Sequence, residues 1–106
     1  MAKYLIEATY TTEGVRGLLK DGGTRRRAAV EAAVKAVGGT LESFYFGFGS
    51  TDVHLIVDGV DPSTAAAVGL TVSASGAVHT KTTVLLTPEE IDKACQTTIA
   101  YRAPGA

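Results

Sequence analysis

Among the ionisable side chains of the predicted strands, four form a candidate set for acid–base chemistry: Glu7, His54, His79 and Lys81. A carboxylate beside imidazole and ammonium groups can act in general acid–base catalysis, or can form an anion-binding pocket. The same residues could instead form a structural salt bridge between Glu7 and Lys81, with two histidines in ordinary surface or core positions. Both interpretations require a sheet that brings distant segments side by side.

Tyrosines are a second group of candidate ligand residues. In the aromatic run FYFGF, strand alternation would direct Tyr45 to one face, and the phenylalanines to the other: Phe44, Phe46 and Phe48. We expect the phenylalanines in the core. The Tyr45 hydroxyl could meet a ligand or, more simply, a partner subunit. Tyr10 is expected to line the same ligand cavity.

The segment 22–27, with the sequence GGTRRR, is a candidate phosphate site. Backbone N–H groups at a helix start and nearby guanidinium groups both bind anions. Three cations in a first turn also oppose the helix dipole, which an anion would offset. The candidate ligands are Thr24, Arg25 and Arg26. The segment lacks the GxxxxGK[ST] pattern of a P-loop, and the alternative is a set of solvated surface arginines.

Metal and nucleophile chemistry find little support in the sequence. His54, His79 and Cys95 do not form a CxxC or HxxxH pair, so we expect no metal site. GxSxG is absent, and nothing marks Cys95 as an activated thiol; it is most simply a buried small residue. No cofactor is expected.

Length and composition predict one cytoplasmic domain over residues 1–106. The chain has 106 residues and is 45% hydrophobic, which is enough for a core without disulfides. A net charge of −1 gives no field that would attract nucleic acid. The N-terminal residues lack the h-region of a signal peptide, and no apolar run is long enough for a membrane span.

Alternation and helical periodicity locate the elements that would position these residues. Strands are predicted by period-two patterns at four places: 3–10, 40–49, 52–59 and 77–86. Helices are predicted at 25–37, 62–75 and 88–95, whereas 11–23 is expected to be a loop with a brief helix. The expected helix caps are Thr24, Asp61 followed by Pro62, and a capping box from Thr87 to Glu90.

The order β-α-β-β-α-β followed by a short C-terminal helix and tail predicts an α+β domain of ferredoxin-like type with an antiparallel four-stranded sheet. Both long helices would cover one face of the sheet. The other face would carry hydrophobic and aromatic side chains beside polar ones, and an isologous dimer would bury it. Ile99 and Tyr101 make the tail apolar enough to cross to a neighbouring subunit.

Several short segments carry a resemblance to a known family: YTTEG at 10–14, Gly38-Gly39, FYFGFG at 44–49, Asp52, and LTPEE at 86–90. With these segments the chain resembles the GYD family of small bacterial proteins, which are similar to the dimeric α/β-barrel group of ferredoxin-like folds. Gly49 and Asp52 match the motif that names the family. Thr51 stands where the tyrosine is expected. The resemblance implies the fold and a homodimer, and implies no agreed activity.

Three functions are consistent with these residues. The first is a homo-oligomer that binds a small molecule in a cavity at the open sheet face, lined by Tyr10, Tyr45 and His54 with Glu7 nearby. The second is a structural or protein-interaction subunit without a ligand. The third is a cofactor-independent enzyme in which His54 or Glu7 accepts a proton.

Overall fold

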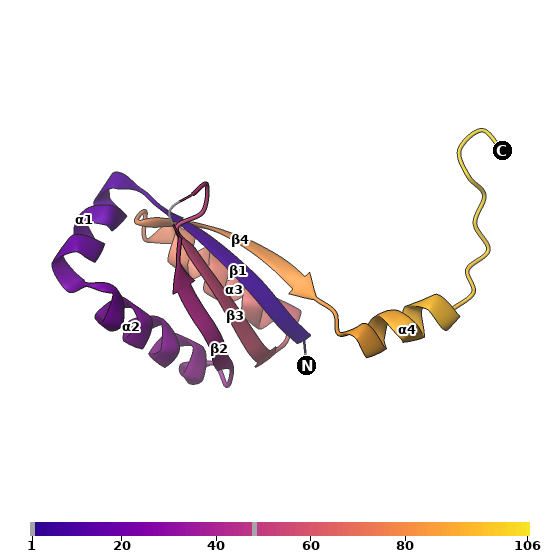
Figure 1. Ribbon diagram of the computed structural model, residues 1–106, viewed down its shortest axis with the longest axis horizontal. Coiled ribbons are helices and arrows are strands. Elements are labelled where there is room, and N and C mark those ends of the chain that lie inside the picture. The colour runs from indigo at the N-terminus through magenta and orange to yellow at the C-terminus, as the bar shows by residue number, and fades with distance from the viewer. Residues whose placement is uncertain (1, 48) are drawn as a thin grey trace.

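The computed structural model describes residues 2–47 and 49–106 and shows a sheet covered on one face by helices (Figure 1). The antiparallel strands lie in the order β2-β3-β1-β4. Their bounds are β1 Ala2–Tyr10, β2 Thr40–Phe46, β3 Val53–Val60 and β4 Val78–Leu85. The helices are α1 Thr12–Asp21, α2 Gly23–Ala36, α3 Pro62–Ala74 and α4 Pro88–Gln96. The predicted position of Phe48 falls outside the described residues.

The predicted α+β ferredoxin-like fold is confirmed, and α1 is added between β1 and α2. We expected a loop with a brief helix there, but α1 has 10 residues. It begins at the Thr11 cap, whose side chain accepts a hydrogen bond from the Gly14 amide at 3.2 Å. Gly14 is the small residue that this packing needs, because a Cβ there would lie 2.1 Å from the Ala77 carbonyl oxygen. Gly14 therefore permits close packing, and the glycines of this segment do not prevent a helix.

The predicted Thr24 cap is wrong, because the cap of α2 is Gly22 and the helix begins at Gly23, two residues before the predicted start at 25. Gly22 lies at the end of α1 and at the start of α2 with a φ of 80°, a conformation that favours glycine. Its amide donates to the Leu18 carbonyl at 2.8 Å. A single left-handed residue thus ends one helix and starts the next, and Thr24 lies in the first turn.

The other two predicted caps are confirmed. The Asp61 carboxylate accepts a hydrogen bond from the Thr64 amide at 2.8 Å, and Pro62 follows at the first helical position. Thr87 and Glu90 form a reciprocal capping box with donor–acceptor distances of 3.0 and 3.1 Å. Each cap satisfies amides that the first helical turn leaves unpaired.

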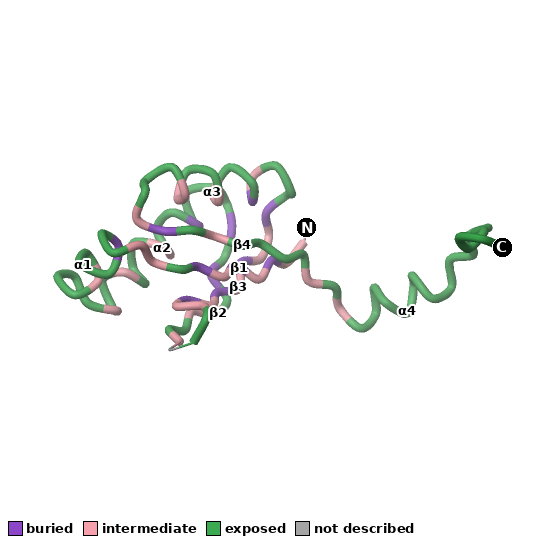
Figure 2. The backbone as a smooth tube through the Cα atoms, turned by 90° about the horizontal axis from the view of Figure 1, so that it is seen from above, coloured by how far each residue is buried: buried purple, intermediate pink, exposed green. Residues whose placement is uncertain are grey.

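The core lies between the sheet and the helices, where alternate residues of β1 and β3 are buried. Helix α2 contacts β2, and α3 contacts β4, so the two helices lie over the same face (Figures 1 and 2). The buried apolar residues of the sheet include Tyr4, Ile6, Val53 and Leu55, and Val34 of α2 packs against them. The alternate positions form the open face that the sequence predicted.

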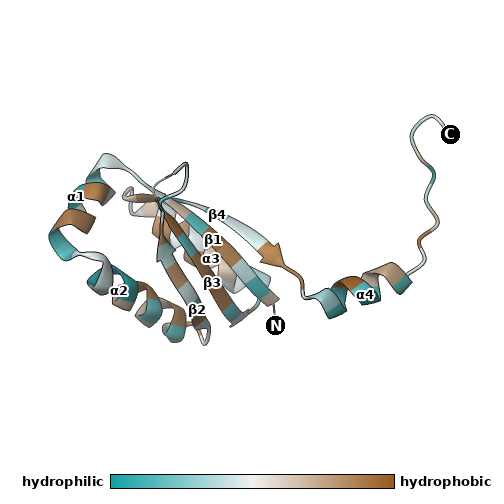
Figure 3. Ribbon diagram, viewed as in Figure 1, coloured by the Kyte–Doolittle hydropathy of each residue, from teal (hydrophilic) through white to brown (hydrophobic). Residues whose placement is uncertain are grey.

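The C-terminal arm, residues 88–106, extends away from the sheet (Figures 1 and 2). All of its residues are exposed, including Ile99 and Tyr101. Cys95 is also exposed, so its predicted burial is wrong. Helix α4 carries both hydrophobic and hydrophilic residues (Figure 3), but no other part of the described chain covers it. That the arm crosses to a neighbouring subunit stays a prediction.

Candidate functional site

Four of the predicted ligand residues form one row across the open face of the sheet. Tyr45 on β2 pairs with His54 on β3. His54 pairs with Glu7 on β1, and Glu7 pairs in turn with Lys81 on β4. His79 lies on the same face, two residues before Lys81. The strand registers therefore bring together side chains that are distant in the sequence.

The Glu7 carboxylate has two polar neighbours on this face. Its Oε2 atom lies 3.5 Å from the Thr51 hydroxyl and 4.0 Å from Nδ1 of His54. The imidazole also approaches the backbone of Gly47, where a Cβ would lie 3.3 Å from Nε2. Lys81 lies opposite Glu7 in the register, but the two form no ion pair within 4.0 Å. The expected Glu7–Lys81 salt bridge is therefore not formed.

Tyr10 does not belong to this row, and that part of the prediction is wrong. Positions 7 and 10 of a strand point to opposite faces, so the sheet separates Tyr10 from Glu7. Tyr10 is half-buried and packs against the core on the helix side.

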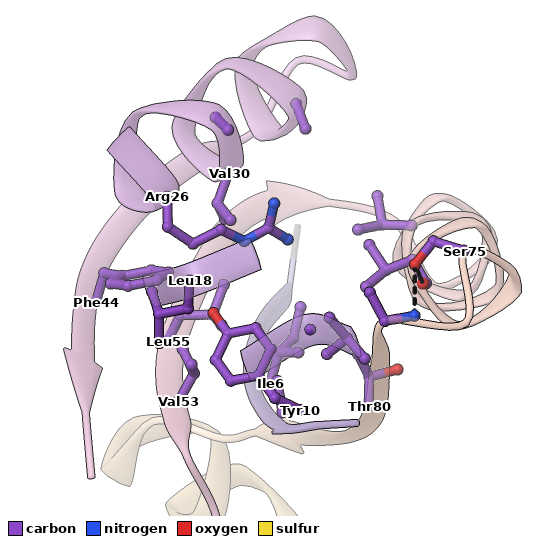
Figure 4. Close-up of a pocket in the computed structure, with 18 of the residues that line it drawn as sticks. Ile6, Tyr10, Leu18, Arg26, Val30, Phe44, Val53, Leu55, Ser75 and Thr80 are labelled. Carbon is purple, nitrogen blue, oxygen red and sulfur yellow. Dashed lines mark hydrogen bonds between the residues drawn. The ribbon is translucent and has the colours of Figure 1, made fainter. Parts of the chain in front are cut away.

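The predicted anion ligands of α2 are also separated from one another. Thr24 and Arg25 are exposed in the first turn, whereas Arg26 is half-buried. The guanidinium of Arg26 points into the space between α2 and α3 (Figure 4). The first turn of α2 contains no acidic residue that would offset these cations. Phosphate binding by the three residues together stays a prediction.

A cavity of about 460 Å³ lies between the sheet, α1 and α2 on one side and α3 on the other. Its walls are mainly apolar, as Figure 4 shows for Ile6, Val30, Phe44, Val53 and Leu55. The cavity opens to solvent on the helix side of the sheet, on the face opposite to the row that contains Glu7.

Among residues 2–47 and 49–106, five polar or charged side chains line this cavity: Tyr10, Asp21, Arg26, Ser75 and Thr80. Two of them already have hydrogen-bond partners within the fold. Ser75 donates to the Val72 carbonyl at 2.6 Å, and the hydroxyls of Thr80 and Ser73 lie 3.3 Å apart. The remaining polar groups available to a ligand are the Tyr10 hydroxyl, the Arg26 guanidinium and the exposed Asp21 carboxylate.

The cavity exists because small residues line it where larger side chains would meet. Ala29 and Ala33 are one helical turn apart on α2, and Gly69 lies on α3. The cavity is not visible in the sequence, because its volume depends on how far α2 stands from α3. The alanine pair at an i, i+4 spacing was the available signal, since it places small side chains on one face of the helix.

No three side chains of His, Cys, Asp or Glu gather into a metal-binding group within residues 2–47 and 49–106. None of the described helices combines the length and the apolar composition needed to cross a lipid bilayer.

Comparison with known families decides where this fold belongs. A family model described as the GYD domain matches residues 4–95. The chain belongs to the GYD domain family. The match begins within β1, spans the other three strands and the first three helices of this GYD domain, and ends within α4. No curated protein and no solved structure matches the chain.

Within this GYD domain, the motif aspartate has a structural contact. The Asp52 carboxylate accepts a hydrogen bond from the Tyr10 amide at 2.9 Å, and the Asp52 amide donates to the Ala8 carbonyl at 2.9 Å. These two bonds join the end of β1 to the start of β3. Asp52 therefore holds together the strands that carry Glu7 and His54.

Proposed function

We propose that this GYD domain binds a small, largely apolar molecule in the cavity between its sheet and its helices. The cavity itself carries the proposal. At about 460 Å³ it falls within the range of roughly 300–1,000 Å³ that is common for ligand pockets. Like those pockets, it combines apolar walls with a few polar groups.

Packing energetics support a bound molecule. Protein interiors are close-packed, and apolar walls that face water lose both burial and dispersion energy. An apolar ligand would cover the partly buried Val30, Phe44 and Val72 and would restore these contacts. The opening on the helix side gives such a molecule a route of entry.

The test uses N-phenyl-1-naphthylamine, a neutral apolar dye whose fluorescence rises when it leaves water. We expect saturable binding to the wild-type protein and at least about tenfold weaker binding to Val72→Phe, because the larger side chain enters the cavity. Leu70→Phe is the matched control, since Leu70 lies on the same helix but is 72% exposed and outside the cavity. Absence of saturable binding, or equal binding by both variants, would contradict the proposal.

A second candidate places the ligand at the open sheet face of a homo-oligomer. The row formed by Tyr45, His54, Glu7 and Lys81, with His79 beside it, favours this candidate. An isologous dimer through this face would enclose the row between two sheets. In the enzyme version of this candidate, His54 or Glu7 accepts a proton from the enclosed substrate.

The third candidate is a structural or protein-interaction subunit without a ligand. Its support is the exposed apolar surface of the C-terminal arm, at Ile91, Ile99 and Tyr101. The dye experiment separates this candidate from cavity binding, because an interaction subunit predicts no difference between Val72→Phe and Leu70→Phe.

A further inference from the structure

We infer that the cavity on the helix side selects amphipathic anions, apolar molecules with a carboxylate head group, and that Arg26 binds the head group. This inference rests on the proposed function of the same cavity and adds the chemical class of its ligand.

Arg26 is the first support for a negatively charged ligand. It is half-buried on α2, and its guanidinium points into the cavity (Figure 4). All ion pairs within residues 2–47 and 49–106 lie on the sheet, and Arg26 takes part in none of them. An arginine is always charged in proteins, and a charge beside apolar walls is stabilised by a partner of opposite charge. A carboxylate on the ligand would supply that partner.

The geometry of a guanidinium favours a carboxylate over a neutral polar group. Its N–H groups form a planar fork that can donate two parallel hydrogen bonds to the two oxygens of one carboxylate. Tyr10 presents a further hydroxyl to the same space (Figure 4). Ser75 and Thr80 add little, because their hydroxyls already bond within the fold.

The charges around the cavity have mixed signs, and their balance also favours an anion. Asp21 lines the cavity but is exposed and lies more than 4.0 Å from Arg26. Arg25 and Arg27 are exposed near the start of α2, and the first turn of this helix contains no acidic residue. Arg26 thus adds to a cationic helix start, and among the described lining residues Asp21 is the one carboxylate that would repel an anion.

The remainder of the lining defines the rest of the ligand. Apart from the polar groups named above, the cavity presents aliphatic and aromatic side chains, such as Ile6, Phe44 and Val72. These side chains stabilise an apolar tail and provide no hydrogen-bond partners for additional hydroxyl or amide groups. A sugar or a nucleotide would lose hydrogen bonds to water without replacing them. A medium-chain fatty acid has the expected combination of head and tail.

The experiment compares octanoate with octan-1-ol at pH 7, by NMR titration of the methyl groups of Val30, Leu55 and Val72. We expect octanoate to bind the wild-type protein about tenfold more tightly than the alcohol, as a charge-assisted hydrogen bond implies. Arg26→Gln should remove this preference without weakening the binding of octan-1-ol. Arg25→Gln should leave the preference unchanged, although it alters the net charge by the same amount.

The outcomes separate the two levels of the proposal. If neither compound shifts the methyl resonances of the cavity, cavity binding and anion selection both fail. If both compounds bind equally, or if the preference for octanoate survives in Arg26→Gln, the cavity binds apolar molecules but the inference about Arg26 is overturned. Asp21→Asn provides a second variant that leaves Arg26 in place. Asp21→Asn should increase the affinity for octanoate about twofold and leave the affinity for octan-1-ol unchanged. An unchanged affinity for octanoate would count against the anion site.

Discussion

The hydroxyl of Thr51 lies 3.5 Å from the Glu7 carboxylate, so the turn between β2 and β3 contacts the middle of β1 on the open face. The family resemblance leads us to expect tyrosine at position 51. With threonine there, the group beside Glu7 is a short hydroxyl, and the His54 imidazole is the second polar neighbour of the same carboxylate. The turn between β2 and β3, which carries the family motif, therefore contacts the polar row of the open face.

Asp52 in this turn should contribute measurably to stability. Asp52→Ala leaves the partly buried Tyr10 amide without its acceptor, and we expect the free energy of unfolding to fall by about 1–3 kcal/mol. Asp52→Asn retains an acceptor oxygen, so its free energy of unfolding should fall by less than that of Asp52→Ala. Urea unfolding followed by circular dichroism measures both variants. Equal losses would show that the negative charge matters more than the hydrogen bond to Tyr10.

Tyr4 should be more stable as phenylalanine. Its side chain is 2% exposed, and its hydroxyl has no hydrogen-bond partner within the described part of the chain. A buried hydroxyl without a partner costs free energy, so Tyr4→Phe should raise the free energy of unfolding by about 1 kcal/mol. Tyr45→Phe is the control, because Tyr45 is 71% exposed and should change stability by less than about 0.5 kcal/mol. A destabilised Tyr4→Phe would indicate that a water molecule bonds the hydroxyl.

Substitution of two helical glycines by alanine should change the free energy of unfolding in opposite directions. At Gly69 a Cβ would make ordinary contact with the Thr80 hydroxyl at 3.5 Å, so Gly69→Ala should gain about 0.5–1 kcal/mol from helix propensity. At Gly14 a Cβ would clash with the Ala77 carbonyl, and Gly14→Ala should lose about 1–3 kcal/mol. Thermal unfolding monitored by circular dichroism compares the two variants. If Gly14→Ala instead raises the free energy of unfolding, α1 must be able to move away from Ala77.

The local parts of the fold were predictable from the sequence, whereas the parts that depend on distance between elements were not. Asp61 and Thr87 act through residues within three positions, so their caps are visible in the sequence. Strand alternation correctly placed Glu7 and His54 on one face. The same alternation placed Tyr10 on the other face, and grouping it with Glu7 ignored that parity.

The cavity and the exposure of Cys95 depend on how distant elements are arranged, so neither could be predicted from the sequence. Ala33 and Gly69 create space only because α2 and α3 stand apart, and no local pattern encodes that separation. Cys95 has the composition of a buried residue, but the described chain offers no surface against which α4 packs. In both cases tertiary arrangement, and not residue type, determines the outcome.

The α3 cap should make stability depend on pH in the acid range. The side chain and the backbone amide of Thr64 lower the pKa of Asp61 below its ordinary value of 3.8. A lowered pKa in the folded state contributes stability that is fully present above the unfolded value and is lost as the pH falls through the folded value. Urea unfolding at pH 7, 4 and 3 should therefore show that the free energy of unfolding declines less in Asp61→Asn than in the wild-type protein. The asparagine side chain accepts the same hydrogen bond but does not titrate. An identical decline would assign acid sensitivity to other carboxylates.

Self-association through the open face should depend on Tyr45. The face exposes this ring beside half-buried Leu5 and Ile56, and a second copy of the sheet would cover all three side chains. We expect Tyr45→Arg to convert an oligomer into a species of 10.9 kDa in light scattering, because the interface would bury an arginine charge without a partner. Leu70→Arg places the same charge on the outer surface of α3 and should leave the oligomer intact. If the wild-type protein itself has a mass of 10.9 kDa at every concentration, the open face is not a dimer interface. If instead Tyr45→Arg remains an oligomer, the exposed arm that contains Ile99 and Tyr101 becomes the surface to truncate next.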